Sequence, residues 1–364
     1  MDGSRRNFIA AVGCSSVLCC ASKAIGESEL AVLSKDNELI IGNGELEFEV
    51  FHQFPKLPEP FTWQTTHNVA VDAEQNLYVI HEGDVQKKDH PSIFVFDSNG
   101  QYVRSFGQQF QGGGHGLEVR TEGSEQFLYV TGYKSIKSFA KLTLRGETVW
   151  KKRAPVESEA YKPGEEEGSD FGFQRDRFLP TNFGFLPDGG FLLADGYGTY
   201  LIHRYDRDAK WISCFGGPGK EPGEFNTPHG LTVDASNPEE PTVIIADRAN
   251  NRVQRLTIDG ESLEVWDGFE LPANIQIQGE EMLVPELYAR LSILDRKGKR
   301  IATLGDDTAR LKADKQKQIR VTPSEWREGK FVTPHDACFD SVGNIYIAEY
   351  VPQLGRVTKL KRRS

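Results

Sequence analysis

Short apolar runs separated by polar turns recur along the whole chain. One unit, "HGLTVDASNPEEPTVIIADRANNRVQRL", shows the pattern: an apolar run, a polar turn, a second apolar run and a third that alternates. Similar units begin near residues 67, 115, 182, 229, 274 and 335. Apolar runs of about four to eight residues bounded by turn residues are typical of β-strands. The pattern therefore predicts a chain of short strands grouped in six similar units.

The length of these units indicates how they assemble. Four-stranded units of about 40–50 residues that repeat about four to eight times are typical of a β-propeller. The outer strands follow as pairs split by a turn, for example "SIFVFDSNGQYVRSFG" around Ser98-Asn99-Gly100. We therefore predict an all-β, six-bladed propeller over residues 44–364. The alternating segment 46–54, "LEFEVFHQF", is expected to pair with residues 335–361 and close the ring.

Three segments lie outside the repeats. Residues 25–43 have mixed composition and are expected to form an N-terminal lead. Residues 155–178 and 306–331 are charged, weakly periodic insertions, and "PSEWREGK" in the second is compatible with a helical turn. Loops of this length are functional rims or solvated surface insertions, and the sequence leaves both interpretations open.

The N-terminus has the features of an export signal. Paired arginines, Arg5 and Arg6, precede an uncharged stretch and small residues near position 24. We expect residues 1–24 to be a twin-arginine-type signal peptide and the mature protein to be periplasmic or extracellular. A lipid anchor on Cys14 or Cys20 is not favoured, because neither flank matches a lipobox.

Charge and cysteine content narrow the range of partners. Removal of residues 1–24 takes away Arg5, Arg6, Lys23 and Asp2, and so changes 43 basic and 53 acidic residues to 40 and 52, a net charge of −12. This charge opposes binding to nucleic acid or anionic lipid. No interior apolar run is long enough to span a bilayer. Only Cys214 and Cys338 remain in the mature chain, so a disulfide framework is not expected.

The first position of the units carries the candidate chemistry. It is occupied in order by His67, His115, Asn182, His229, Asn274 and His335. Every second blade then supplies a histidine, so that His115, His229 and His335 would stand about 120° apart around the axis. Three neutral imidazoles that leave one coordination position open form a typical catalytic zinc site. A histidine taken singly is more often a hydrogen-bonded turn residue, and only the shared repeat position favours a metal site.

Further residues extend this candidate site. Asp336, which follows His335 where other units have glycine or asparagine, is a candidate ligand for Ca²⁺ or a turn cap. "ADGY" (194–197) and "ADR" (246–248) occupy matching places in neighbouring blades and bring Tyr197 and Arg248 together. A guanidinium and a metal cation beside a phenol both favour its ionised form, which suits a proton acceptor. Alternatively, Tyr197 packs and Arg248 pairs with Asp195 or Asp247.

At these residues the chain resembles the lyase domain of the peptidylglycine α-amidating enzymes, a six-bladed propeller of NHL-type repeats. The resemblance runs from about residue 64 to 361 and is closest in "PGEFNTPHGLTVD", "IIADRANNRVQRL" and "LLADGY". It implies zinc ligands at His115, His229 and His335, a catalytic Tyr197 and an active-site Arg248. It also implies a structural calcium site at Asp336 and the carbonyls of Val69 and Leu117. The family cleaves a peptidyl-α-hydroxyglycine to an amidated peptide and glyoxylate.

Two departures from the family lie close to the expected site. Glu82 stands where the family has its second active-site arginine, and this reversed charge is expected to repel a substrate carboxylate. His67 stands where the family has a small residue, so it adds an imidazole that could join the metal, relay a proton or pack. The substrate of this chain therefore does not follow from the resemblance alone.

The sequence thus predicts an exported, metal-dependent lyase of the amidating type that acts on a small-molecule or peptide substrate as a monomer. In this prediction Zn²⁺ is the catalytic ion and Ca²⁺ a structural one. The alternative is a non-catalytic propeller that binds a peptide, glycan or protein partner. A propeller hydrolase such as a sugar lactonase is less compatible, because those enzymes depend on a carboxylate-rich calcium centre.

Overall fold

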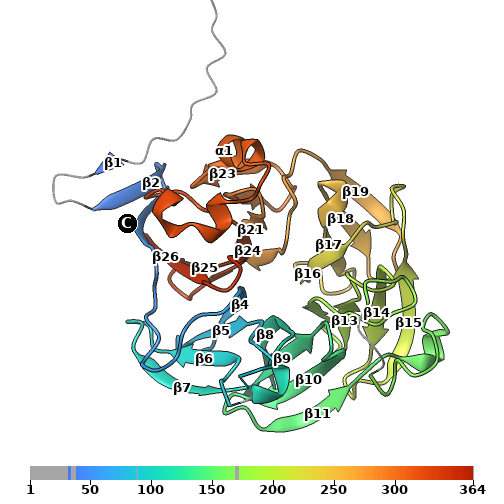
Figure 1. Ribbon diagram of the computed structural model, residues 1–364. Coiled ribbons are helices and arrows are strands. Elements are labelled where there is room, and N and C mark those ends of the chain that lie inside the picture. Colours follow the sequence, from blue (N-terminus) through green and yellow to red (C-terminus); the bar gives the residue numbers. More distant parts are fainter. Residues whose placement is uncertain (1–31, 34–37, 88, 169–171, 364) are drawn as a thin grey trace, which may run out of the picture.

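Six blades form a ring around a central axis in the computed structural model, which describes residues 32–33, 38–87, 89–168 and 172–363 (Figure 1). The all-β, six-bladed propeller predicted from the repeats is therefore confirmed. Residues 1–24 lie outside the described residues, and the export signal expected there stays a prediction. No helix in the described part of the chain is long and apolar enough to cross a membrane.

The first five blades are each a four-stranded antiparallel sheet in which strand order follows chain order. The first strand of each blade lies innermost, beside the axis (Figure 1). Blades one to three contain β4 (Thr66–Val71), β5 (Leu77–His81), β6 (Ile93–Phe96), β7 (Tyr102–Phe106), β8 (Gly114–Glu122), β9 (Glu125–Gly132), β10 (Ser138–Thr143), β11 (Thr148–Lys152), β12 (Phe183–Phe185), β13 (Phe191–Ala194), β14 (Leu201–Tyr205) and β15 (Trp211–Gly216). Blades four and five contain β16 (Pro228–Asp234), β17 (Thr242–Asp247), β18 (Arg252–Thr257), β19 (Ser262–Trp266), β20 (Gln276–Gln278), β21 (Glu281–Glu286), β22 (Arg290–Asp295) and β23 (Arg300–Leu304).

The sixth blade joins the two ends of the described chain. Its inner strands are β24 (Pro334–Phe339), β25 (Ile345–Glu349) and β26 (Arg356–Arg362). Its outer strand is β3 (Leu46–Phe51), which pairs with β26 so that Val50 stands opposite Leu360. The predicted closure of the ring is therefore confirmed. Beyond β3, the sheet continues with β2 (Leu39–Asn43) and β1 (Val32–Leu33), so part of the expected lead is in strands.

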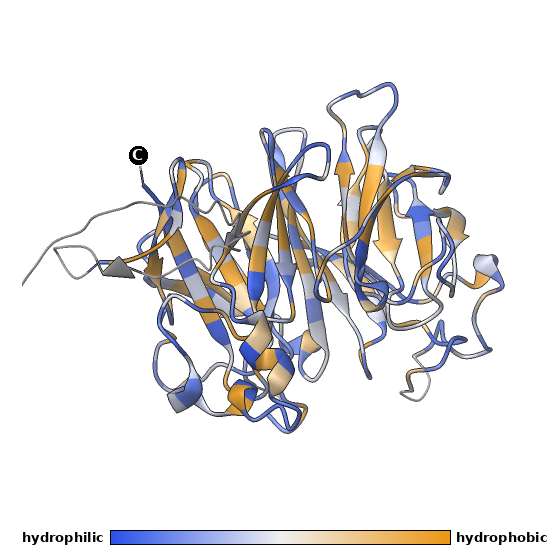
Figure 2. Cartoon of the chain, turned by 90° about the horizontal axis from the view of Figure 1, so that it is seen from above, coloured by the Kyte–Doolittle hydropathy of each residue, from blue (hydrophilic) through white to orange (hydrophobic). Residues whose placement is uncertain are grey.

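The core is divided among the faces between blades. One cluster of buried apolar side chains lies at each of the six blade interfaces, such as the cluster of Ile80 and Val130 between blades one and two. The strands carry these apolar residues inside the ring, while the turns at both rims are hydrophilic (Figure 2). Alternation of side chains along each strand explains why both faces of a blade are buried against its neighbours.

Both insertions are anchored by buried side chains, and Leu311 and Ile319 of the second lie in an apolar cluster with Ala289 and Val351. In the first, Glu165 is fully buried and accepts hydrogen bonds from Lys137 Nζ at 2.9 Å and Arg177 Nη1 at 3.0 Å. The second contains a short helix, α1 (Thr308–Ala313). The 3₁₀ turns are η1 (Gln108–Phe110), η2 (Val156–Ser158), η3 (Arg248–Asn250), η4 (Ile319–Val321) and η5 (Pro323–Glu325), the last within the segment expected to hold a helical turn.

Candidate metal centre and catalytic site

Four histidines meet at the axis because each lies at an irregularity of an inner strand. The pairing register shifts next to the histidine in β4, β8, β16 and β24. A β-bulge breaks the alternation of a strand and turns a side chain in a new direction. The four side chains accordingly meet, and neighbouring imidazole rings have centroids 4.6–5.0 Å apart. The four residues are His67, His115, His229 and His335.

The ring nitrogens of three histidines are oriented by backbone carbonyls. Nδ1 of His115 donates to Thr181 O at 3.0 Å, Nδ1 of His229 to Ala273 O at 2.6 Å and Nδ1 of His335 to His67 O at 2.9 Å. A carbonyl only accepts, so in each ring the proton sits on Nδ1 and the lone pair on Nε2. Three Nε2 lone pairs are therefore available at the axis.

Burial keeps these imidazoles in the neutral form that binds metals. All four rings are at most 2% exposed. Burial lowers the pKa of His115, His229 and His335 well below the ordinary value, and neighbouring positive charge lowers it further. Burial also lowers the pKa of His67, although the Glu82 carboxylate opposes that shift. Neutral imidazole is the ligating form of histidine.

The spacing of the nitrogens fits a bound cation. Nε2 of His115 and Nε2 of His229 lie 3.2 Å apart, although both carry lone pairs. Single ring nitrogens of His67, His115 and His335 all lie within 4.8 Å of one another. Four nitrogens bound to zinc at about 2.0–2.1 Å in a tetrahedron lie about 3.3–3.4 Å from one another. Among the described residues, His67, His115 and His335 form the group whose nitrogens lie close enough together to hold an ion, and of the predicted ligands His229 is near it only through its 3.2 Å spacing to His115.

Tyr197 and Arg248 meet beside these nitrogens. The Tyr197 hydroxyl lies 2.9 Å from His229 Nε2 and 3.2 Å from His115 Nε2, and Arg248 Nη1 donates to it at 3.1 Å. Tyr197 follows β13 in a loop held by the buried Asp195, whose Oδ1 accepts from Leu179 N at 2.6 Å. Asp195 and Asp247 are both engaged by other groups, and among the described residues neither pairs with Arg248.

Glu82 is engaged by three neighbours. Its Oε2 lies 3.5 Å from His67 Nε2 and accepts from the Tyr133 hydroxyl at 2.7 Å, while Lys134 Nζ contacts its Oε1. Burial alone would raise the pKa of Glu82, but these three contacts lower that pKa to about 2. The carboxylate therefore stays ionised at neutral pH, and Lys134 balances its charge.

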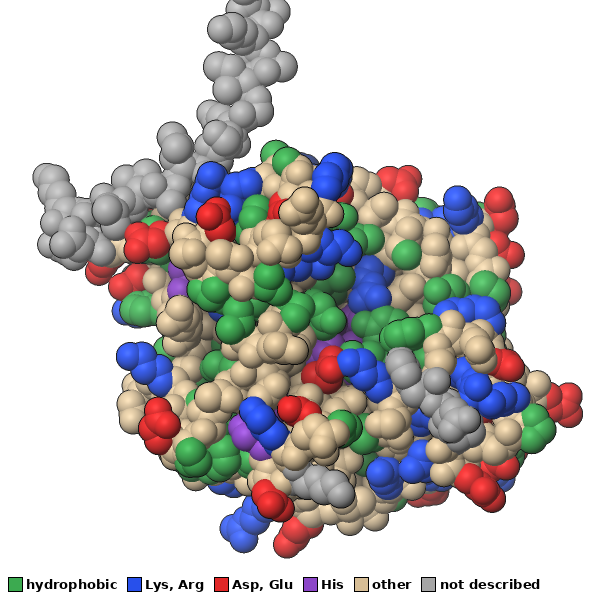
Figure 3. Space-filling model, viewed as in Figure 1, with side chains coloured by type: hydrophobic (Ala, Val, Ile, Leu, Met, Phe, Trp, Pro, Cys, Tyr) green, Lys and Arg blue, Asp and Glu red, His purple; other side chains and the backbone are tan. Residues whose placement is uncertain are grey.

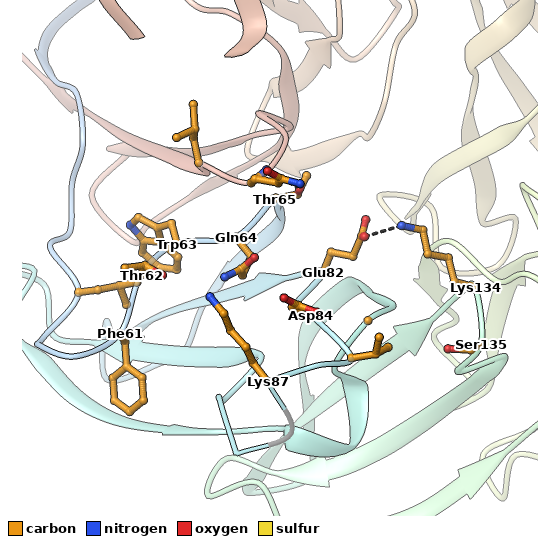
Figure 4. Close-up of a pocket in the computed structure, with 16 residues that line it drawn as sticks. Phe61, Thr62, Trp63, Gln64, Thr65, Glu82, Asp84, Lys87, Lys134 and Ser135 are labelled. Atoms are coloured by element: carbon orange, nitrogen blue, oxygen red, sulfur yellow. Dashed lines mark hydrogen bonds and ion pairs between the residues drawn. The ribbon is translucent and has the colours of Figure 1, made fainter. Parts of the chain in front are cut away.

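Two cavities open at this end of the channel. The smaller, of about 410 Å³, is lined by Tyr197, Arg248, His335 and, from the second insertion, Arg320. The larger, of about 1050 Å³, extends over blade one, with Glu82 and Lys134 on one side and aromatic side chains on the other (Figure 4). Histidine is visible at the bottom of the central hollow, bordered by basic, acidic and hydrophobic side chains (Figure 3).

A second polar layer lies further along the axis. Asp336 Oδ2 accepts from Val69 N at 2.9 Å, and its Oδ1 accepts from Asn274 Nδ2 at 2.5 Å. Glu118, next to Leu117 in β8, accepts from Asn182 Nδ2 at 2.9 Å. The pKa values of Asp336 and Glu118 are raised by burial, and for Glu118 also by the Asp336 charge. Oxygens Oδ1 of both asparagines are buried and have no hydrogen-bond partner within the described part of the chain.

Several residues of the site were not found from the sequence. Tyr133 and Tyr350 stand directly after strands that correspond to the one before Arg248, so the repeat register itself could have indicated them. Glu118 lies three residues after His115 and was detectable in the same way. Arg320 belongs to an insertion without repeat register, and only the fold brings it to the cavity.

Comparison with known proteins identifies similar propellers. No protein-family model matches the chain. It is 28% identical over 251 residues to NHL repeat-containing protein 3 of Homo sapiens, covering 66% of this chain and 67% of that protein. It is 27% identical over 217 residues to the peptidyl-glycine alpha-amidating monooxygenase of Mus musculus, covering 52% of this chain but only 20% of that much longer protein.

Solved structures share the fold at low sequence identity. A streptogramin B lyase structure aligns with TM-score 0.54 and 11% identity, covering 88% of this chain and all of that chain. A catalytically inactive variant of virginiamycin B lyase from Staphylococcus aureus, solved with quinupristin, aligns with TM-score 0.52 and 13% identity, covering 86% and 99%. These similarities support the propeller architecture alone.

Proposed function

We propose that this protein is a metal-dependent lyase that cleaves the C–N bond of an α-hydroxyglycine-type substrate and releases an amide and glyoxylate. The observation that carries the proposal is the Tyr197 hydroxyl, held by Arg248 at 3.1 Å and placed against the Nε2 atoms of His115 and His229. The partial similarity to the amidating monooxygenase, over 52% of this chain, also supports it.

The side chains divide the reaction among them. His115, His229 and His335 would hold Zn²⁺, and the bound ion would supply Lewis acidity toward the substrate hydroxyl. Tyr197 accepts the proton of that hydroxyl as the oxygen forms the aldehyde carbonyl of glyoxylate. The C–N electron pair passes to nitrogen, which takes up the proton that Tyr197 received and leaves as the amide. Arg248 stabilises negative charge on Tyr197 through its hydrogen bond.

The small cavity suits a substrate that carries a carboxylate. Arg248 and Arg320 both line it, and its described lining contains no acidic residue. Guanidinium groups bind carboxylates in a bidentate manner. Glu82 does not contradict this preference, because Lys134 balances its charge and Tyr133 is hydrogen-bonded to it. The larger cavity beside it, walled by Phe61 and Trp63, would receive the acyl part of the substrate.

The same proposal places Ca²⁺ in the second polar layer. Asp336 and Glu118 are buried carboxylates, and each raises the free-energy cost of ionising the other. The amide oxygens of Asn182 and Asn274 are also buried, and they lack a hydrogen-bond partner among the described residues. Hard oxygen ligands of this kind suit calcium. The backbone carbonyls of Val69 and Leu117 are the further ligands expected from the sequence.

The test combines metal content with product formation. We expect about one zinc per chain in the mature protein and release of glyoxylate from N-acyl-α-hydroxyglycines. Tyr197→Phe should keep the zinc but lower kcat by about 10²–10⁴-fold, the range of a lost general base. Tyr200→Phe is the matched control, since Tyr200 lies three residues on and outside the small cavity. Full activity of Tyr197→Phe would remove the tyrosine from the mechanism.

A non-catalytic binding propeller is the second candidate. The large cavity over blade one, of about 1050 Å³ with aromatic and charged walls, is suited to a peptide or glycan. Stoichiometric zinc without turnover of any α-hydroxyglycine derivative would favour this function over the lyase.

A further inference from the structure

His67 has the geometry of a metal ligand rather than of a packing residue. It is fully buried, and its ring centroid lies 4.6 Å from those of both His115 and His335. Its Nδ1 lies 3.4 Å from Nε2 of His335. This separation matches that of two nitrogens that share one tetrahedral zinc ion, about 3.3–3.4 Å.

The neighbouring Glu82 favours one tautomer of His67. Nε2 of His67 faces Oε2 of Glu82 at 3.5 Å, and a carboxylate only accepts hydrogen bonds. With a metal on Nδ1, the proton of this ring sits on Nε2, which faces that carboxylate and has no hydrogen-bond partner among the described residues. His335 Nδ1 donates to the carbonyl of His67, so Nε2 of His335 carries a lone pair. Without a metal, Nδ1–H of His67 can donate to this lone pair at 3.4 Å, whereas a cation between the two nitrogens is bound by both lone pairs.

We propose that His67 is the fourth imidazole ligand of the metal centre, bound through Nδ1, and that Glu82 orients it through Nε2–H. A carboxylate behind a ligating histidine fixes its tautomer and raises its basicity. Glu82 is itself held by Tyr133 and Lys134, so the histidine is braced from blade two. The proposal rests on the metal centre of the proposed function but not on its reaction.

This arrangement explains why His67 and Glu82 occur together. An arginine at position 82 would donate to Nε2 of His67, move the proton to Nδ1 and prevent ligation by that atom. Ligation by His67 also changes where a substrate can bind the ion, because four imidazoles fill a tetrahedron. The substrate must then bind as a fifth ligand, an expansion that zinc sites accommodate.

The deciding experiment is a crystal structure of the zinc-loaded mature protein, together with zinc affinities measured by competition with a chelating dye. We expect Nδ1 of His67 at bonding distance, about 2.0–2.1 Å from the ion. His67→Ala and Glu82→Arg should each weaken zinc binding by about tenfold or more, the scale of lost ligand support. His81→Gln, which replaces a buried imidazole of blade one outside the cluster, should bind zinc as the wild type does.

A zinc ion held by three imidazoles and water, with His67 beyond bonding distance, would overturn the proposal, as would unchanged affinity in both variants. These results are separable from those on activity. Four imidazoles without glyoxylate release would retain this centre and reject the lyase, whereas three imidazoles with glyoxylate release would do the reverse. Absence of any bound zinc after metal reconstitution would reject both.

Discussion

Single side chains at the axis take their chemical properties from partners on other blades. His229 in blade four has its lone pair on Nε2 because the Ala273 carbonyl, at the start of blade five, fixes its proton on Nδ1. Glu82 in blade one is balanced by Lys134 in blade two. Asp336 and Glu118, from blades six and two, show this dependence most clearly. Ionising either buried carboxylate costs free energy unless a positive charge lies nearby.

These two carboxylates give a calcium prediction at the residue scale. Ca²⁺ should stabilise the zinc-loaded protein by about 2.7 kcal/mol when its free concentration is a hundredfold above Kd, whereas Mg²⁺ should not, because it prefers a smaller octahedral shell. Glu118→Gln keeps the side-chain shape and should abolish the response. The measurement is Tm with and without each ion. An equal calcium response in Glu118→Gln would exclude Glu118 from the site.

The inner strands determine how accurately the histidines are placed. Each of the four histidines lies at a register shift. For His115, His229 and His335, a backbone carbonyl of the next blade approaches the ring. A Cβ atom at Gly230 would lie 2.1 Å from Asn274 Oδ1 and 2.6 Å from Ala273 O, the carbonyl that orients His229. The glycine after the histidine is therefore required by the next blade.

This close contact gives a prediction at the element scale. Gly230→Ala should destabilise the protein by roughly 1–3 kcal/mol through overpacking and weaken zinc binding by about 10–100-fold, because the carbonyl behind His229 must move. Gly184→Ala on inner strand β12 is the control, since its Cβ would come no closer than 3.3 Å to Val233. Denaturant unfolding and zinc competition measure both effects. Similar behaviour of the two variants would show that Ala273 does not position His229.

The whole ring depends on one strand contributed from the opposite end of the chain. β3 completes the blade that carries His335, and Phe48 of β3 is fully buried against blades five and six. Because each blade packs only on its neighbours and the ring has no other closure among the described strands, loss of this strand opens the sixth blade.

Phe48 and Phe51 test this closure at the scale of the whole molecule. Phe48→Ala should cost about 3–5 kcal/mol, the usual range for a buried phenylalanine. Phe51, on the same strand but 38% exposed, should change stability by less than about 0.5 kcal/mol when replaced by alanine. Denaturant midpoints give both values. A small effect of Phe48→Ala would mean that β3 contributes little to closure.

Repeat register explains what was predictable. The positions of His67, His115, His229 and His335 followed from their shared place in the units, as did the neighbouring positions of Tyr197 and Arg248. The role of Glu82 did not follow, because its effect depends on Tyr133 and Lys134, which lie 51 and 52 residues away. Arg320 was equally hidden, since its insertion matches no unit.

The sequence by itself determined the number of blades, the strand that closes them and the residues that face the axis, because alternation and repeat spacing are local properties of the chain. Only the tertiary structure decided which nitrogen of each histidine is free, which charges are balanced and which insertion residue reaches the cavity. Those properties depend on distances of about 3 Å between groups on different blades. Such distances arise from packing, bulges and closure of the ring.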